Sequence, residues 1–215
     1  MEEWNLDFGN FDCDIDLNAF EVSTNENSII ETRYIKPKFT PLKSKQICYE
    51  HARKLATDIG IIKDGDRYDC IVSGAFIFGD FLEAYLVENA LGCEELTITT
   101  LSMSQENIDS LHTLLAKHYV NKLNLIISDY FYSHERHALV PYIYDYLDIN
   151  NKFQLSVASI HTKTMQLKME DGTKIVMHGS ANLRSSANVE QFTIEANPEL
   201  YDFYDNLFMV WFLKG

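Results

Sequence analysis

The sequence lacks the features that mark membrane and secreted proteins. Its 215 residues contain no run of 18 or more apolar residues, so no segment is predicted to span a membrane. The N-terminus has no basic region followed by an apolar stretch, which argues against a secretory signal. The four cysteines form no Cys-x-x-Cys pair, so neither a disulfide framework nor a zinc knuckle is indicated. We therefore expect a cytoplasmic protein with free thiols.

Positive charge is also scarce. The chain has 18 Lys and Arg against 32 Asp and Glu, a net charge of −14 that argues against loose, charge-driven binding to nucleic acid. Residues 1–32 hold nine of the acidic residues and no Lys or Arg. We predict that 1–32 form an acidic arm and that 33–215 form a single domain. Aromatic residues lie among the acids, so the arm could bind a basic surface in this chain or in a partner protein. The alternative is a disordered leader.

Alternating strand and helix patterns dominate the chain from about residue 68. The predicted strands are 69–73, 95–99, 123–128, 153–160 and 192–196; the predicted helices are 44–59, 79–89, 135–147 and two that begin at 104 and 197. Residues 164–169 and 173–178 are two further strands, and the Asp171-Gly172 pair between them is a strong hairpin signal. Such alternation predicts an α/β/α sandwich around a mixed, mostly parallel central sheet.

Two short segments combine the residue types that bind a phosphate group. His161 and Lys163 are two positions apart at the end of a predicted strand, so their side chains are expected to share one face. The next strand ends in the small-residue turn 179–182, in which Gly179 allows close backbone approach and Ser180 and Asn182 supply neutral hydrogen-bond donors. Imidazole, ammonium and neutral donors around one point favour an oxyanion site.

His-x-Lys followed by Gly-Ser-x-Asn resembles the signature half of the phospholipase D-like, or HKD, superfamily. The longer string through Glu190 is similar to single-motif members from phage and bacterial genomes, some of which are nucleases. The resemblance extends over roughly residues 68–199 in element order, and it implies a phospholipase D-like fold. Because the chain holds one such half, the resemblance also implies a homodimer that completes the site across a two-fold axis.

The resemblance assigns a role to each motif residue. His161 is the expected nucleophile, which forms a phosphohistidine, and His161 of the second copy would protonate the leaving oxygen. Lys163 and Asn182 would hold the non-bridging phosphate oxygens, Ser180 would add a hydrogen bond, and Glu190 would orient His161. The expected activity is that of a phosphodiesterase, a hydrolase acting on nucleic acid or another phosphodiester, with no metal, no cofactor and no membrane partner.

One position departs from the motif of the superfamily. An Asp is expected five residues after the Lys, where this sequence has Lys168. If Lys168 points into the site, it would bind substrate and favour phosphate binding over cleavage. The alternative function is therefore a catalytically weak or inactive protein on the same fold that binds phosphate, nucleic acid or a protein partner.

A second segment, 128–137, follows a predicted strand and is rich in aromatic residues. Ligands of open α/β sheets gather at the carboxyl ends of strands, so this segment could line the substrate cleft. Arg136 and His134 would then contact phosphate, and the aromatic rings would stack on bases. The alternative is the start of a helix with packed rings.

Overall fold

The computed structural model describes residues 44–49, 52–73, 77–184 and 188–212, so the predicted acidic arm lies outside the described residues. The described part contains an eight-stranded sheet in the order β1-β2-β8-β7-β6-β3-β4-β5. The strands are β1 (Ser44–Tyr49), β2 (Arg67–Ser73), β3 (Cys93–Thr100), β4 (Leu123–Ser128), β5 (Phe153–Ala158), β6 (Thr164–Met169), β7 (Lys174–Gly179) and β8 (Val189–Ala196).

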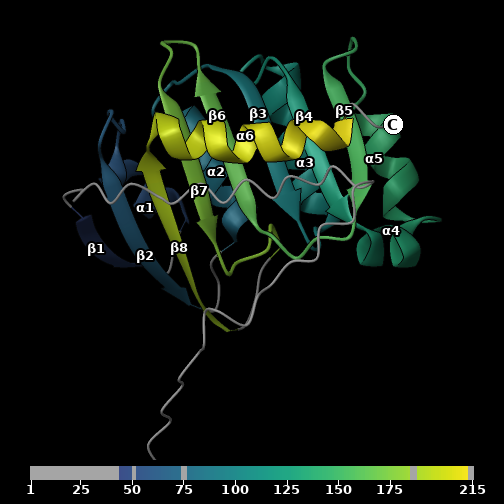
Figure 1. Ribbon diagram of the computed structural model, residues 1–215, viewed down its shortest axis with the longest axis horizontal. Coiled ribbons are helices and arrows are strands. Elements are labelled where there is room, and N and C mark those ends of the chain that lie inside the picture. Colours follow the sequence, from purple (N-terminus) through teal and green to yellow (C-terminus); the bar gives the residue numbers. More distant parts are fainter. Residues whose placement is uncertain (1–43, 50–51, 74–76, 185–187, 213–215) are drawn as a thin grey trace, which may run out of the picture. The chain divides into compact units, whose positions relative to one another are not determined.

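Helices cover both faces of the sheet (Figure 1). They are α1 (Ala52–Ile59), α2 (Phe78–Glu88), α3 (Gln105–Ala116), α4 (Asp129–Glu135), α5 (Leu139–Leu147) and α6 (Pro198–Phe212). In Figure 1, α6 crosses one face in front of the strands, and α1, α2 and α3 lie behind the sheet. The predicted three-layer α/β/α architecture is therefore confirmed.

The sheet is mixed, as predicted, but antiparallel pairing is more frequent than the sequence suggests. β1 pairs with β2, β3 with β4, and β4 with β5 in parallel, whereas β2–β8, β8–β7, β7–β6 and β6–β3 are antiparallel. The hairpin and the last strand enter the middle of the sheet, between its two parallel groups. The expectation of a mostly parallel sheet is corrected in this respect.

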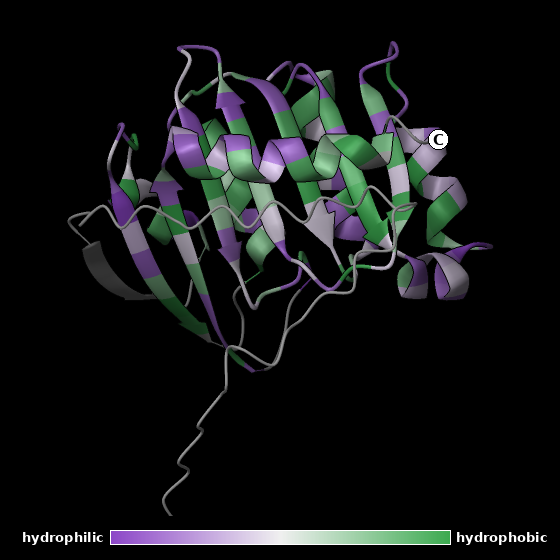
Figure 2. Cartoon of the chain, in the orientation of Figure 1, coloured by the Kyte–Doolittle hydropathy of each residue, from purple (hydrophilic) through white to green (hydrophobic). Residues whose placement is uncertain are grey.

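Hydrophobic and hydrophilic residues are interspersed along the strands (Figure 2), and their side chains are sorted between the two faces of the sheet. The face toward α1, α2, α3 and α5 carries the main hydrophobic core, with Leu96, Ile98 and Phe192 fully buried. On the α6 side Gln166 is fully buried, and its Nε2 donates to the Tyr201 carbonyl of α6 at 3.3 Å. Because a sheet alternates its side chains, the apolar and polar residues of one strand are sorted between the two layers.

Two local predictions differ from the structure. Residues 44–59 were predicted as one helix, but Ser44–Tyr49 forms an edge strand parallel to β2 and the helix begins at Ala52. Pairing with β2 thus overrides the helical spacing of the apolar residues. The predicted helix 135–147 starts late, as α5 at Leu139, whereas Glu135 is the last residue of α4. Pro141 accounts for the late start, because it lies in the first turn of α5, where its missing N–H costs no helical hydrogen bond.

Most other elements follow the sequence prediction. The β6–β7 hairpin forms, and Gly172 in its turn has a φ of +89°, a conformation that glycine adopts without steric cost. Ser104 is the N-cap of α3, and its backbone N–H donates to Asn107 Oδ1 at 2.9 Å. No helix in the described ranges has both the length and the apolar character that a bilayer crossing requires.

Candidate active site

The chain segments that carry the predicted motif meet at one edge of the sheet. β6 begins at Thr164 and β7 ends at Gly179, and the antiparallel register pairs Thr164 with His178. β8 begins at Val189 on the other side of β7. The parallel strands β3, β4 and β5 end at this same edge, because β3 pairs Thr99 with Thr164. This is the edge at which α/β sheets bind ligands.

His161 and Lys163 lie side by side just before β6, as the two-residue spacing predicts. Lys163 Nζ is 3.1 Å from His161 Nδ1 and donates to the His161 carbonyl at 2.8 Å. Lys163 is 8% exposed, whereas His161 is exposed. Burial lowers the pKa of the Lys163 ammonium below its usual range, and the negative charge of Glu190 opposes this shift.

The contact between the two side chains decides which imidazole nitrogen is free. An ammonium group has donors only, so Nδ1 of His161 accepts from Lys163 and the ring proton lies on Nε2. Since His161 is exposed, Nε2 is the nitrogen that a ligand at this edge would meet. In this tautomer the imidazole can donate its Nε2 proton but cannot attack with Nε2. Attack requires the proton to lie on Nδ1 and a carboxylate to accept a hydrogen bond from Nδ1–H.

Ser180 and Glu190 join the turn after β7 to the start of β8. The Ser180 hydroxyl donates to Glu190 Oε2 and accepts from the backbone N–H of Gln191 at 3.1 Å. The backbone N–H of Ser180 donates to the Gln191 carbonyl at 2.9 Å. Glu190 was expected to hold His161, but within the described residues its hydrogen-bond partner is Ser180. The carboxylate is therefore held at the site edge without orienting the imidazole of its own chain.

Gly179 lies where β7 and β8 pack closely together. A Cβ on this residue would lie 2.6 Å from Phe192 Cα and would also collide with the Gln191 carbonyl oxygen. Its backbone N–H already donates to the Lys163 carbonyl at 3.3 Å. The glycine lets β7 and β8 approach closely enough to bring Ser180 to Glu190, and the expected contact of Gly179 with substrate stays a prediction.

Asn182 lies partly buried at the end of the same turn. Its Oδ1 is buried and has no hydrogen-bond partner within the described part of the chain. The next residue, Leu183, accepts at its carbonyl from the backbone N–H of Gly79 at 3.1 Å, which fixes the turn against the start of α2. An amide oxygen only accepts hydrogen bonds, so this atom does not bind phosphate oxygens, and the expected contact between the Asn182 amide N–H and phosphate stays a prediction.

Three threonines were missed by the sequence analysis. Thr99 Oγ1 is 2.9 Å from Thr164 Oγ1, accepts from Thr162 Oγ1 at 3.0 Å and accepts from the Thr164 backbone N–H at 3.1 Å. This cluster fixes the segment that carries His161 and Lys163 against the end of β3. Their only sequence signal was the placement of Thr162 and Thr164 on either side of Lys163.

Lys168 does not belong to this site. It lies near the opposite end of β6, opposite Glu95 of β3 and Lys174 of β7 in the strand register. Its Nζ forms an ion pair with Glu94 at 2.9 Å. The expectation that Lys168 adds positive charge to the site and binds substrate is therefore corrected. Lys163 directly precedes β6, whereas Lys168 lies near the other end of this strand.

His134 and Arg136 lie at the same sheet edge as the motif residues, but on α4 and just beyond it. α4 follows β4 directly, and β4 is separated from β6 by β3. His134 Nδ1 is 2.7 Å from the Tyr130 carbonyl, and Arg136 Nε donates to His137 Nε2 at 3.1 Å. The structure thus gives His134 and Arg136 local partners and no contact with His161 or Lys163 among the hydrogen bonds of the described residues.

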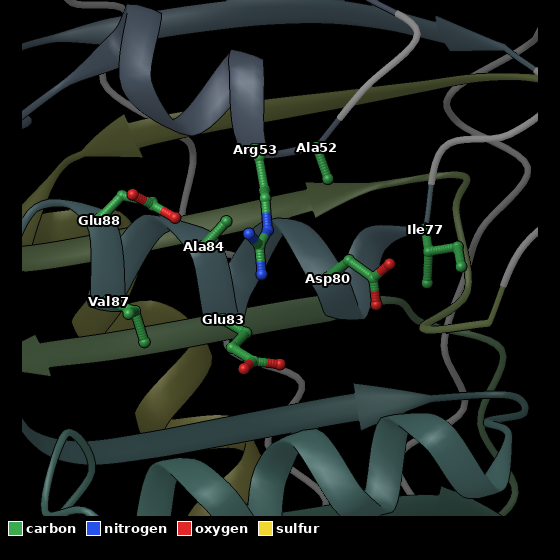
Figure 3. A pocket seen from close by; sticks show the side chains of 8 residues that line it. All are labelled: Ala52, Arg53, Ile77, Asp80, Glu83, Ala84, Val87 and Glu88. Atoms are coloured by element: carbon green, nitrogen blue, oxygen red, sulfur yellow. The ribbon is translucent and has the colours of Figure 1, made fainter.

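A cavity of about 500 Å³ lies elsewhere, between α1 and α2 (Figure 3). In Figure 3, Arg53 of α1 extends toward α2 between Asp80 and Glu83. Burial and the charge of Glu83 raise the pKa of the Asp80 carboxyl, and Arg53 opposes this shift. No residue of the His161 cluster lines this cavity. Within the described ranges, no three His, Cys, Asp or Glu side chains are grouped so that they could hold a metal ion.

Comparison with known proteins identifies the fold. No family model matches the sequence, and no curated protein is similar to it. Polyphosphate kinase from Porphyromonas gingivalis matches with a TM-score of 0.52 and 15% identity over 68% of this chain and 26% of that chain. Nuc, a phospholipase D family member from Salmonella typhimurium, has a TM-score of 0.48 and 14% identity over 70% and 97% of the two chains. Yeast tyrosyl-DNA phosphodiesterase has a TM-score of 0.32 and 13% identity over 50% and 27%.

The polyphosphate kinase comparison is the one that supports a conclusion about the fold. This chain spans about a quarter of that enzyme, so the likeness concerns a domain-sized part of it. The chain therefore has a mixed α/β fold similar to that of a part of this polyphosphate kinase.

Proposed function

We propose that this protein is a metal-independent phosphodiesterase, and specifically a nuclease, that acts through a phosphohistidine at a homodimer interface. The observation that carries the proposal is the convergence of His161, Lys163, Ser180 and Glu190 at the carboxyl edge of the sheet. The resemblance of the motif to single-motif nucleases carries the choice of nucleic acid. Lys168 pairs with Glu94 away from this cluster, which favours a phosphodiesterase over a protein that only binds phosphate.

In the proposed reaction, His161 Nε2 attacks the phosphorus while the bond to the leaving oxygen breaks. His161 of the second copy gives its Nε2 proton to that oxygen, and the Lys163 ammonium stabilises charge on the non-bridging oxygens. Water then attacks the phosphorus, the P–N bond breaks with its electron pair returning to Nε2 of the first imidazole, and the second imidazole takes up the proton of that water. The attacking ring needs its proton on Nδ1. Because Nδ1 faces Lys163 and Glu190 binds Ser180 in the described half-site, the attacking copy requires Lys163 to leave Nδ1 and a carboxylate to take its place.

Two copies are required by this chemistry. One described half-site holds one exposed imidazole and one ammonium, whereas the reaction needs a nucleophile and a separate proton donor. If the two-fold axis of a dimer passed beside His161, one copy of this residue would be the nucleophile and the other the proton donor, each in a different tautomer. The described tautomer, with its proton on Nε2, is the one that the proton-donating copy needs.

The proposal is tested by hydrolysis in excess EDTA. The intact protein is expected to cleave bis-p-nitrophenyl phosphate and DNA whether or not divalent cations are present. During turnover of a radiolabelled phosphodiester, rapid denaturation at alkaline pH is expected to trap label on the protein as an acid-labile phosphoramidate. Activity that disappears with EDTA and returns with Mg²⁺ or Mn²⁺ would contradict the mechanism, as would turnover without any trapped label.

The pH profile provides a test of Lys163. The ammonium binds phosphate only while it is protonated, and burial lowers its pKa, so phosphate affinity is expected to fall as pH rises at a lower pH than for an ordinary lysine. Lys163→Arg should remove this alkaline decline, because a guanidinium stays charged. The measurement is inhibition of turnover by inorganic phosphate between pH 6 and about 10. Lys168→Ala is the matched control and should keep the wild-type profile; an unchanged profile in Lys163→Arg would exclude this role.

A further inference from the structure

The short helix α4 exposes aromatic side chains in a way that folding does not require. Phe131 is 4% exposed and packs in the core, whereas its neighbours Tyr130 and Tyr132 are 60% and 40% exposed. The helix is fixed in place by Ser128, whose hydroxyl donates to the Leu101 carbonyl at 2.9 Å and accepts from the Phe131 N–H at 2.9 Å. One ring thus anchors α4, and two rings are held outward.

Imidazole and guanidinium groups lie beside the exposed rings. The rings of Tyr130 and His134 are 4.1 Å apart, centroid to centroid, and His134 Nδ1 is fixed 2.7 Å from the Tyr130 carbonyl. Arg136 and His137 directly follow α4, and Arg136 Nε donates to His137 Nε2 at 3.1 Å. We refer to Tyr130, Tyr132, His134 and Arg136 as the aromatic platform. Flat rings and a guanidinium on a fixed helix provide stacking surfaces for bases, whatever their sequence.

The aromatic platform lies at the same edge of the sheet as the candidate site. α4 begins where β4 ends, and β3 is the one strand between β4 and β6. Two strand spacings amount to about 10 Å, so a polynucleotide with a phosphate at His161 could run along the edge to the platform. Asp129 and Glu135 lie on the same helix, so backbone phosphates gain little net attraction there. The platform is therefore better suited to bases than to phosphates.

We propose that the aromatic platform binds the unpaired bases of single-stranded nucleic acid and leads the strand to His161. This inference rests on the proposed nuclease function and adds to it the form of the substrate. Stacking needs accessible base faces, which a duplex does not present except at its ends. The net charge of −14 points the same way, because the protein cannot depend on phosphate neutralisation for affinity. Binding should therefore vary less steeply with salt than it does for basic nucleic-acid-binding proteins.

The test measures the affinity for a fluorescein-labelled twelve-residue oligothymidylate by fluorescence anisotropy. The full chain is used with His161→Asn so that the probe is not cleaved. Adding Tyr130→Ala and Tyr132→Ala is expected to weaken binding about tenfold or more, since each stacked base contributes on the order of 1–3 kcal/mol. Tyr144→Ala is the matched control, because Tyr144 is 51% exposed but lies on α5. Duplex DNA of the same length should bind more weakly than the single strand.

Activity and oligomeric state separate the possible outcomes. With His161 present, the Tyr144→Ala control should hydrolyse bis-p-nitrophenyl phosphate and oligothymidylate at the wild-type rates, whereas the double tyrosine variant should lose more activity on oligothymidylate than on bis-p-nitrophenyl phosphate. Equal oligothymidylate affinity in the double variant and the Tyr144→Ala control would overturn the inference and leave the phosphodiesterase proposal intact. A change in the mass of the variant in analytical ultracentrifugation would overturn it too, because the platform would then be an interface between copies. If the wild type hydrolyses neither substrate but binds through the tyrosines, the proposed function fails and the inference holds.

Discussion

Asn in place of His161 is expected to reduce turnover by at least about 10⁴-fold while leaving the protein as stable as the wild type. The large effect follows from the double use of the residue, since in the proposed dimer one substitution removes both the nucleophile and the proton donor. The stability should not change, because His161 is exposed and its side-chain partner is the neighbouring Lys163. Hydrolysis of bis-p-nitrophenyl phosphate and urea unfolding measure the two quantities.

His178→Asn provides the opposite control. His178 lies one residue before Gly179, and its Nε2 is 3.2 Å from Oε1 of Glu195, a carboxylate that is 3% exposed. The pKa of Glu195 is lowered although burial acts to raise it, because His178, Asn197 and Arg67 stabilise the charged form. Removing the imidazole should therefore cost about 1–3 kcal/mol of stability. Turnover at a temperature where the variant is folded should stay close to the wild-type rate. If His178→Asn lost activity and His161→Asn did not, the assignment of the nucleophile would be wrong.

The sequence was informative where one local signal determines one local structure. The hairpin at Asp171-Gly172, the cap at Ser104 and the neighbouring placement of His161 and Lys163 follow from turn chemistry, capping and the two-residue repeat of a strand. The candidate site residues likewise belong to two short segments, so the sequence alone was enough to propose them. Their roles stay a prediction.

The remaining features depend on contacts between distant segments. Ser44–Tyr49 becomes a strand because β2 offers it a parallel partner, which the helical spacing of its apolar residues does not reveal. Lys168 was expected near the site because it is five residues from Lys163 along the chain. In space, its side chain forms an ion pair with Glu94 instead. Glu190 was assigned to His161 from the motif alone, whereas the pairing of β7 with β8 places it beside Ser180.

Gly179→Ala is expected to destabilise the protein by about 3 kcal/mol and to impair the site, although it adds only one methyl group. The new Cβ would lie 2.6 Å from Phe192 Cα and would collide with the Gln191 carbonyl oxygen. Both obstacles are backbone atoms of β8, so no side-chain rotation can relieve the contact and the two strands must separate. Because the Gln191 N–H holds the Ser180 hydroxyl at 3.1 Å, separation of the strands also moves Ser180 away from Glu190.

Gly172→Ala distinguishes this clash from a general intolerance of the glycine positions. Gly172 has a φ of +89°, and a Cβ added there would meet no atom within 4 Å, so alanine incurs a conformational cost of about 1 kcal/mol and no collision. Urea unfolding should rank the stabilities as wild type, Gly172→Ala and then Gly179→Ala, and turnover should decrease in the last variant alone. Equal losses in the two variants would mean that β7 and β8 can adjust to a side chain at Gly179. The close approach of the two strands would then not be what positions Ser180 and Glu190.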